Sequence, residues 1–368
     1  MPDFKSKYYT EQIITYIGNK RTLLKDIDEI IQSIKEKENK EKLDTADLFS
    51  GSGVVARLLK NNSNMVITND LETYSKIINE CFLSNKNDFN LKQFNKYLEE
   101  INRKIEEKPI KGIISKLYSP KDDLNIEAGE RVFYTNANAM YIDSFRHYID
   151  EVVPEEYKKY FLALLITEAS IHVNTGGVFK GFYKDKNTGI GKFGGAAENA
   201  LSRIKGEIVI KKPVLSNNYS KYQIYQEDAV FLSKKLPKLD LVYLDPPYNQ
   251  HPYGSNYFML NLIIKNEEPQ NISRVSGIPN DWNHSVFNKK NTALSSMDEI
   301  IKNLNSKYIL ISYNNEGFIS FDEMKNMLMK YGNVETKQIK YNTFRGSRNL
   351  RNRDIHTKEY LFLLEKEI

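Results

Sequence analysis

The stretch TADLFSGSGVVARLLKNNSNMVITND at residues 45–70 decides the fold. Its first segment, TADLF, is short and apolar, and it runs into the glycine-rich turn at residues 50–53. VVARLLKNN has helical spacing, and MVITND is a second apolar segment that ends on polar residues. Strand, turn, helix and strand in this order predict the opening unit of a doubly wound parallel sheet.

The same pattern returns near the C-terminus. Segments 222–228, 239–248 and 306–317 are apolar stretches with polar ends and are predicted strands, while 334–344 and 358–367 are predicted to close the sheet as an antiparallel pair. Between 107 and 220 the chain is rich in Tyr, Asn, Lys and Gly and shows no strand–helix alternation. We therefore expect a sheet domain built from residues 1–106 and 221–368, with residues 107–220 as an inserted domain.

Composition narrows the class of protein. The chain has 368 residues, of which 40% are hydrophobic, and no window is apolar enough for a membrane helix. The N-terminus lacks the apolar segment of a signal peptide, so we expect a soluble cytoplasmic protein without a membrane partner.

Cys81 is the only cysteine, which excludes an internal disulfide and a multi-cysteine zinc site. The formal charge is +5, and Lys and Arg concentrate around 180–212 and 338–358, which favours a nucleic-acid surface over a merely solvated one.

Polar residues cluster where the predicted strands end. They are Asp47 to Gly53, Asp70, Asp228 and Asp245 to Tyr248. Ligands bind along this edge of an open parallel sheet. Taken singly, the glycine turn is either a cofactor loop or an ordinary strand–helix turn, because the third glycine of the dinucleotide fingerprint is missing. Asp70 is either a ligand of ribose hydroxyls or a helix N-cap.

The tetrapeptide Asp245-Pro-Pro-Tyr248 is the most specific signal. Two prolines after an apolar strand fix a rigid turn that aims carbonyl oxygens but donates no hydrogen bonds. A carboxylate and a carbonyl can together accept both hydrogens of an amino group. The adjacent tyrosine offers a flat face for stacking, which suits an adenine flipped out of a duplex.

The combination of Phe49-Ser-Gly-Ser-Gly53 with a later Asp245-Pro-Pro-Tyr248 resembles amino-methyltransferases that act on DNA. The order of glycine turn, inserted region and tetrapeptide, with Tyr16-Ile-Gly-Asn-Lys20 near the N-terminus, is similar to the alpha group of adenine-N6 methyltransferases, the Dam-like or D12 class. Segments 312–317 and 341–347 resemble restriction-modification members of that class. Gly18-Asn19 replaces the Gly-Gly common in Dam, which weakens the link to the GATC target of Dam but not to the class.

The resemblance implies a class I S-adenosylmethionine-dependent methyltransferase fold, with helices on both faces of a Rossmann-like, mainly parallel sheet and with residues 107–220 as the target-recognition region. Asp245, Pro246, Pro247 and Tyr248 match the catalytic motif. The positions that match cofactor contacts are Tyr16, Lys20, Asp47, Phe49, Gly51, Gly53, Asp70, Asp228 and Asp245.

The implied reaction moves a methyl group from S-adenosylmethionine to the N6 amino group of adenine in duplex DNA, as in the modification enzyme of a restriction-modification system with a cognate endonuclease. The sulfonium is a good leaving group, so no metal is expected. Candidate phosphate contacts are Lys180, Lys184, Lys192, Arg345 and Arg348. The alternatives are cytosine-N4 in DNA, adenine in RNA, or a non-catalytic DNA-binding subunit, and the Asp at position 245 favours adenine.

Overall fold

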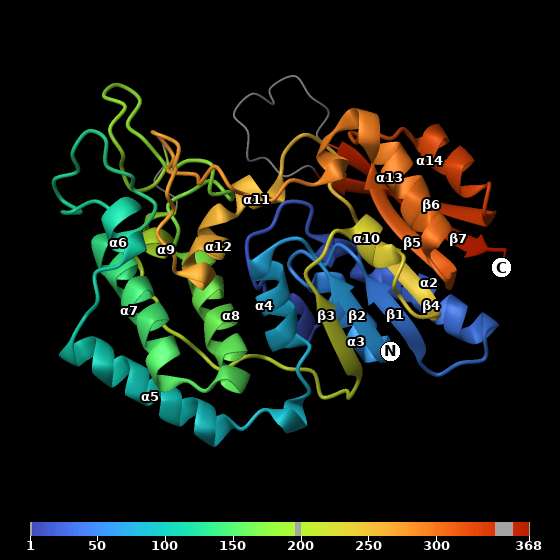
Figure 1. Ribbon diagram of the computed structural model, residues 1–368, viewed down its shortest axis with the longest axis horizontal. Coiled ribbons are helices and arrows are strands. Elements are labelled where there is room, and N and C mark those ends of the chain that lie inside the picture. The colour runs from blue at the N-terminus through green and yellow to red at the C-terminus, as the bar shows by residue number, and fades with distance from the viewer. Residues whose placement is uncertain (1, 196–199, 343–355, 368) are drawn as a thin grey trace.

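A seven-stranded sheet with the order β3-β2-β1-β4-β5-β7-β6 organises the molecule (Figure 1). The computed structural model describes residues 2–195, 200–342 and 356–367. The strands are β1 (Leu43–Asp47), β2 (Ser63–Asn69), β3 (Lys221–Tyr225), β4 (Leu239–Leu244), β5 (Ser306–Asn314), β6 (Gly332–Asn342) and β7 (His356–Lys366). β1 to β5 pair in parallel, whereas β7 runs antiparallel to both β5 and β6. The predicted α/β fold and its antiparallel closing pair are thus confirmed.

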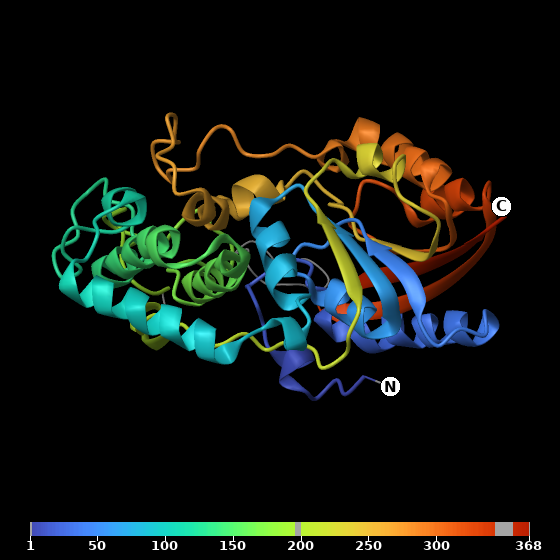
Figure 2. The same cartoon turned by 60° about the horizontal axis from the view of Figure 1, so that its bottom comes forward.

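Helices cover both faces of the sheet (Figure 2). One face packs against α2 (Leu24–Lys37) and α3 (Val54–Asn62), and the other against α10 (Ala229–Ser233), α13 (Lys290–Asn303) and α14 (Phe321–Leu328). Residues alternate between the faces along each strand, so that Leu241 and Tyr243 of β4 join the first core and Val242 and Leu244 join the second. Short elements at the edges are α1 (Lys7–Thr10), η1 (Lys20–Leu23) and η3 (Val286–Asn288).

A helical lobe lies beside the β3 edge of the sheet (Figure 1). Its elements are α4 (Thr73–Phe82), η2 (Lys86–Asp88), α5 (Leu91–Glu107), α6 (Ile113–Leu117), α7 (Asn136–Val152), α8 (Glu155–Ile171), α9 (Leu201–Lys205), α11 (Tyr253–Asn256) and α12 (Phe258–Lys265). One apolar core joins α4, α5, α7, α8 and α12. α12 follows the tetrapeptide in sequence but packs in this core, so the lobe draws on both sides of the predicted insertion, whose bounds stay a prediction. Within the described residues, no helix has the length and apolar character needed to cross a bilayer.

The strand directions decide which residues meet at one edge. Parallel strands β1, β2, β3, β4 and β5 all end there. Because β7 is antiparallel, it begins there instead, and Glu359 near its start pairs in register with Asn314 at the end of β5. β6 is antiparallel to β7 and ends beside its beginning, so the edge combines the ends of six strands with the beginning of the seventh.

Candidate active site

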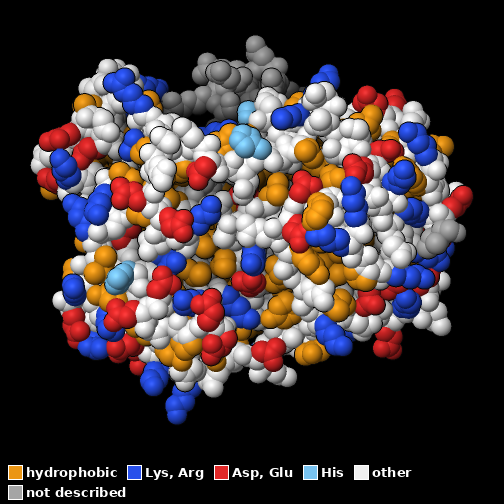
Figure 3. All heavy atoms as spheres, viewed as in Figure 1, with side chains coloured by type: hydrophobic (Ala, Val, Ile, Leu, Met, Phe, Trp, Pro, Cys, Tyr) orange, Lys and Arg blue, Asp and Glu red, His pale blue; other side chains and the backbone are white. Residues whose placement is uncertain are grey.

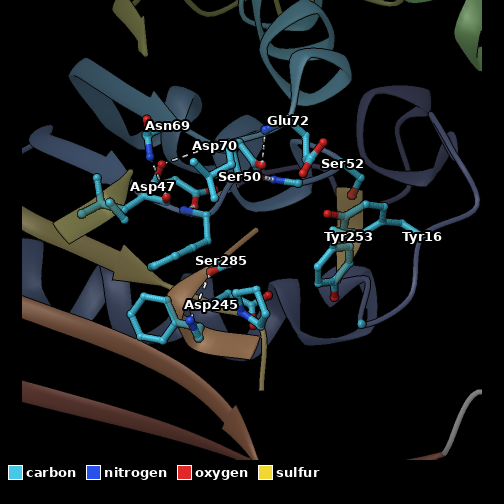
Figure 4. Close-up of a pocket in the computed structure, with 18 of the residues that line it drawn as sticks. Tyr16, Asp47, Ser50, Ser52, Asn69, Asp70, Glu72, Asp245, Tyr253 and Ser285 are labelled. Atoms are coloured by element: carbon cyan, nitrogen blue, oxygen red, sulfur yellow. Dashed lines mark hydrogen bonds between the residues drawn. The ribbon is translucent and has the colours of Figure 1, made fainter. Parts of the chain in front are cut away.

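A pocket opens at this edge of the sheet, and the space it encloses together with the adjoining solvent is about 840 Å³. Figure 4 shows Asp47, Asn69 and Asp70 on one side of it, with Tyr16 and Tyr253 facing one another at the other end. The predicted site residues that line the pocket are Tyr16, Lys20, Asp47, Phe49, Gly51, Asp70, Asp228, Asp245 and Pro247. Gly53, Pro246 and Tyr248 do not line it, although each adjoins residues that do.

The glycine turn brings the backbone close to the pocket. Gly51 and Gly53 have φ values of +50° and +72°, a left-handed conformation that side chains with a Cβ rarely adopt. The amide of Gly51 donates to Oδ2 of Asp70 at 2.8 Å. A Cβ on Gly51 would lie 2.7 Å from the ring of Tyr16, so the aromatic side chain packs directly over the turn. Tyr16 and the turn are distant in sequence, and this contact makes them one wall of the pocket.

The segment that carries Tyr16 is fixed by residues that follow the tetrapeptide. The Tyr16 ring stacks on those of Tyr253 and Tyr257, with centroids 5.0 and 4.9 Å away. The hydroxyl of Tyr257 accepts a hydrogen bond from the amide of Ile17 at 2.8 Å, and the hydroxyl of Tyr253 donates to the Ile17 carbonyl at 3.1 Å. Residues 16–20 are thereby held over the pocket.

Lys20 is the centre of a buried polar network and is only 4% exposed. Its ammonium lies 2.9 Å from Oδ1 of Asp245 and 3.3 Å from Oε1 of Glu359. It also donates to the hydroxyl of Tyr248 at 2.8 Å and to the carbonyl of Gly18 at 3.0 Å. Two residues of the tetrapeptide therefore share one cation.

Burial changes the ionisation of these groups. It raises the pKa of Asp245 to about 7, although the charge of Lys20 opposes this effect and that of Glu359 adds to it. Burial would lower the pKa of Lys20, but Asp245, Tyr248 and Glu359 together hold it well above its ordinary value. The pKa of Asp47 is raised by burial and by the neighbouring charge of Asp245. Perturbed ionisation in a concave site is typical of functional residues.

Asp70 and Asp228 make backbone contacts as well as lining the pocket. Asp70 accepts from the amides of Gly51 and Glu72, which ties the ends of β1 and β2 together. Asp228 accepts from the amides of Val230 and Phe231 and so caps α10. Capping uses only Oδ1 of Asp228, so it is compatible with a ligand contact through the other oxygen.

Sequence reasoning missed Glu72, Tyr253 and Glu359. Glu72 lines the pocket next to Asp70, accepts from Asn261 at 2.6 Å, and has its pKa raised to about 7, chiefly by burial. Tyr253 lies five residues beyond the tetrapeptide and has no local signature. Glu359 could have been found from the sequence, because the start of an antiparallel closing strand must lie at the edge where the parallel strands end.

The family model described as D12 class N6 adenine-specific DNA methyltransferase matches residues 16–327. The chain belongs to this family. It is therefore an enzyme that methylates adenine N6 in DNA and uses a methyl donor, and the cytosine-N4, RNA and non-catalytic alternatives are set aside.

Relatives of this D12-class methyltransferase include two proteins that match over nearly their whole length. The type II methyltransferase M.CviAII of Paramecium bursaria Chlorella virus 1 is 31% identical over 359 residues, 95% of this chain and 98% of that protein. M.NlaIII of Neisseria lactamica, also a type II methyltransferase, is 28% identical over 362 residues, 96% and 99% of the two chains. The modification methylase StsI of Streptococcus sanguinis is 28% identical over 372 residues, 96% of this chain and 52% of that protein.

The lysines predicted to contact DNA in this D12-class methyltransferase differ in position. Lys180 is exposed and lies close to the segment after the tetrapeptide. The pKa of His251 is lowered first by the partial burial of His251 and then by the charge of Lys180. The amide of Phe179, the residue before Lys180, donates to the Asn256 carbonyl at 2.8 Å. Lys184 and Lys192 lie in the glycine-dense loop, where the Lys184 ammonium is 5.0 Å from the ring of Phe182. Arg345 and Arg348 fall outside the described residues. On the face in Figure 3, basic and acidic side chains are interspersed rather than gathered in one patch.

Proposed function

We propose that this D12-class enzyme takes S-adenosylmethionine as its donor in the pocket at the sheet edge. The charge of the pocket carries the proposal. Its acidic lining residues are Asp47, Asp70, Glu72, Glu227, Asp228 and Asp245, and Lys20 is the one basic residue among the described lining residues. S-adenosylmethionine carries a positive sulfonium and a positive amino group against a single carboxylate, so it is a net cation that an acidic pocket complements.

The geometry of the pocket supports the following residue contacts. Asp70 is the acceptor for the ribose hydroxyls, at the end of the second strand, and the turn from Phe49 to Gly53 lets the cofactor approach the backbone. Tyr16 closes over the methionine part, supported by its stack on Tyr253. The aromatic rings favour a cationic group near their faces. Asp228 and Asp47 complete the acidic lining.

The reaction is a direct displacement in which the adenine N6 nitrogen bonds to the methyl carbon, the carbon–sulfur bond breaks with its electron pair going to sulfur, and the nitrogen then releases one proton to water. The bound donor supplies the activated methyl group. The Asp245 carboxylate and the Pro246 carbonyl accept hydrogen bonds from the amino group and orient its lone pair, so positioning supplies most of the acceleration. Pro247 keeps the turn rigid, and Tyr248 stacks on the flipped base. Lys20 holds the Asp245 carboxylate and the Tyr248 hydroxyl in place, because its ammonium contacts both.

The DNA substrate is a duplex held by the helical lobe. Residues 107–220 form the target-recognition region, with Lys180, Lys184 and Lys192 at phosphates, and Arg345 and Arg348, which lie outside that region, contact phosphates as well. Type II methyltransferases among the relatives support a role as the modification enzyme of a restriction-modification system with a cognate endonuclease. The cytoplasm is the compartment where such an enzyme meets its DNA.

Mass spectrometry of DNA methylated by the purified enzyme tests the reaction. The expected result is N6-methyladenine that depends on S-adenosylmethionine, and methylation-sensitive sequencing of DNA from expressing cells should show it in one sequence context. N4-methylcytosine as the product, or no product with an intact donor and duplex, would count against the proposal.

Gly51→Ala is expected to weaken donor binding and to lower the free energy of unfolding by about 1–3 kcal/mol, the usual cost of a side chain at positive φ. The added Cβ would also displace Tyr16, whose ring carbon lies 2.7 Å away. Calorimetric titration with S-adenosylmethionine and denaturant unfolding measure the two effects. Gly181→Ala is the matched control, because a Cβ added at that position would have no other atom within 4 Å. Equal affinity of both variants for S-adenosylmethionine would mean that the glycine turn does not contribute to donor binding.

Lys180→Ala is expected to weaken DNA binding and to reduce the slope of log affinity against log salt concentration by about 0.9, as for one lost phosphate contact. Fluorescence anisotropy with a labelled duplex at several salt concentrations measures this slope. Lys92→Ala, an exposed position on α5, is the control and should leave the slope unchanged. An unchanged slope for both variants would place the phosphate contacts elsewhere.

A further inference from the structure

We propose that Glu359 is a positioning residue for methyl transfer, which holds Lys20 between two carboxylates so that Asp245 keeps an oxygen free for the substrate amino group. The proposal rests on the roles proposed above for Asp245 and Lys20. Glu359 lies on β7, more than a hundred residues beyond the tetrapeptide, and does not line the pocket.

The contacts of Glu359 leave little freedom to its side chain. The residue is 4% exposed, its Oε1 accepts a hydrogen bond from the hydroxyl of Ser312 at 2.7 Å, and the same oxygen lies 3.3 Å from the Lys20 ammonium. Ser312 is itself fully buried on β5, the neighbouring strand. Glu359 therefore fixes the ammonium without itself lining the pocket.

Packing alone gives no reason for a carboxylate at this position. Leu361, two residues further along β7, faces the same side of the sheet and joins its apolar core. Replacing a buried ion pair by apolar side chains is often neutral or stabilising, because desolvation of the charges offsets their attraction. A charge buried here is better explained by what it does to Lys20 and Asp245 than by a gain in stability.

The role proposed for the network around Lys20 depends on how many acceptors share its ammonium. Lys20 contacts Asp245, Glu359, Tyr248 and the Gly18 carbonyl, so its ammonium is shared rather than given to Asp245 alone. Oδ1 of Asp245 is buried and lies 2.9 Å from the ammonium, while the side chain as a whole is 17% exposed, so Oδ2 is the oxygen left for the substrate amino group. Without Glu359 the ammonium would be drawn onto Asp245 and would compete with the substrate amino group for the carboxylate.

Glu359→Gln tests the proposal, with Glu365→Gln as its matched control. Glu365 is on the same strand and the same face, but it pairs with the exposed Lys37 at 2.5 Å, away from the pocket. Glu359→Gln is expected to lower kcat by about 10–10²-fold, as for a small misplacement of a reacting group, with KM for S-adenosylmethionine close to that of the native enzyme. Glu359→Asp should recover part of kcat, and Glu365→Gln should match the native enzyme.

The pH profile of kcat separates positioning from folding. Asp245 must be ionised to accept the amino hydrogens, so activity rises with pH as this carboxyl loses its proton. The charge of Glu359 raises the pKa of Asp245, so its removal should move the acidic limb to lower pH. The titratable and charged groups that face Asp245 are Lys20, Asp47, Tyr243, Tyr248, Tyr253 and Glu359.

The outcomes are distinguishable. Glu359 has no positioning role if Glu359→Gln keeps the native kcat and the native acidic limb of the pH profile. The same conclusion follows if the variant only yields less folded protein, with the native kcat per folded molecule. Should that variant fail to fold, Ser312→Ala decides, since it removes the 2.7 Å hydrogen bond and keeps every charge: a fall in kcat supports the proposal and native kcat overturns it. Asp245→Ala is measured in parallel, and activity in that variant would instead overturn the role proposed for Asp245.

Discussion

Asp245→Ala is expected to reduce methyl transfer by about 10³-fold, the loss typical of removing a preorganised polar contact from a reacting group, while donor binding stays measurable. The adenine amino nitrogen is a weak nucleophile because its lone pair is delocalised into the ring. The Asp245 carboxylate and the Pro246 carbonyl orient that lone pair, and without the carboxylate the amino group has one acceptor only. The pocket keeps its other acidic residues, so the donor should still bind.

Transfer of a labelled methyl group to duplex DNA measures this effect, and calorimetry measures donor affinity. Asp240→Asn, at the opposite end of the same strand, is the control, since Asp240 pairs with Lys40 at the surface. It should retain activity. Native turnover in Asp245→Ala would refute the mechanism, and complete loss of donor binding would mean that the carboxylate acts mainly on the donor.

Lys20→Met is expected to lower the free energy of unfolding by about 3–5 kcal/mol, because the change leaves buried carboxylates without their cation. It should also reduce activity at neutral pH. Lys20 lowers the pKa of Asp245, so its loss raises that pKa above the value of about 7 set in the native protein. The acidic limb of the activity profile should then move to higher pH, opposite to the shift expected for Glu359→Gln.

Denaturant unfolding and the pH dependence of kcat check these two effects. Lys37→Met is the comparison, because Lys37 is 54% exposed and its ion pair with Glu365 is of the surface kind, which contributes about 0–1 kcal/mol. The double variant Lys20→Met/Glu359→Gln should regain part of the lost stability, since it removes one of the two stranded charges. If the single and double variants are equally stable, Lys20 and Glu359 are not coupled.

Periodicity was enough to predict most of the sheet. The apolar segments ending at Asp47, Asn69 and Leu244 became adjacent parallel strands, because each is long enough for one strand and is followed by a turn that cannot continue it. The final two strands paired as predicted. The placement of the lobe was less predictable, because helices on either side of the predicted insertion share one apolar core, and helical spacing does not say which helix packs on which.

For the site, the sequence by itself determined the residues at strand ends: the glycine turn, Asp70, Asp228 and the tetrapeptide, because the end of an apolar segment and the chemistry of the turn after it are local properties. Only the tertiary structure decided that Tyr16 packs over Gly51 and that Lys20 joins Asp245 to Glu359. These contacts depend on the strand order, which sets β7 beside β5 with its beginning at the edge where the others end. No periodicity encodes that order, since it follows from how all the apolar faces are buried at once.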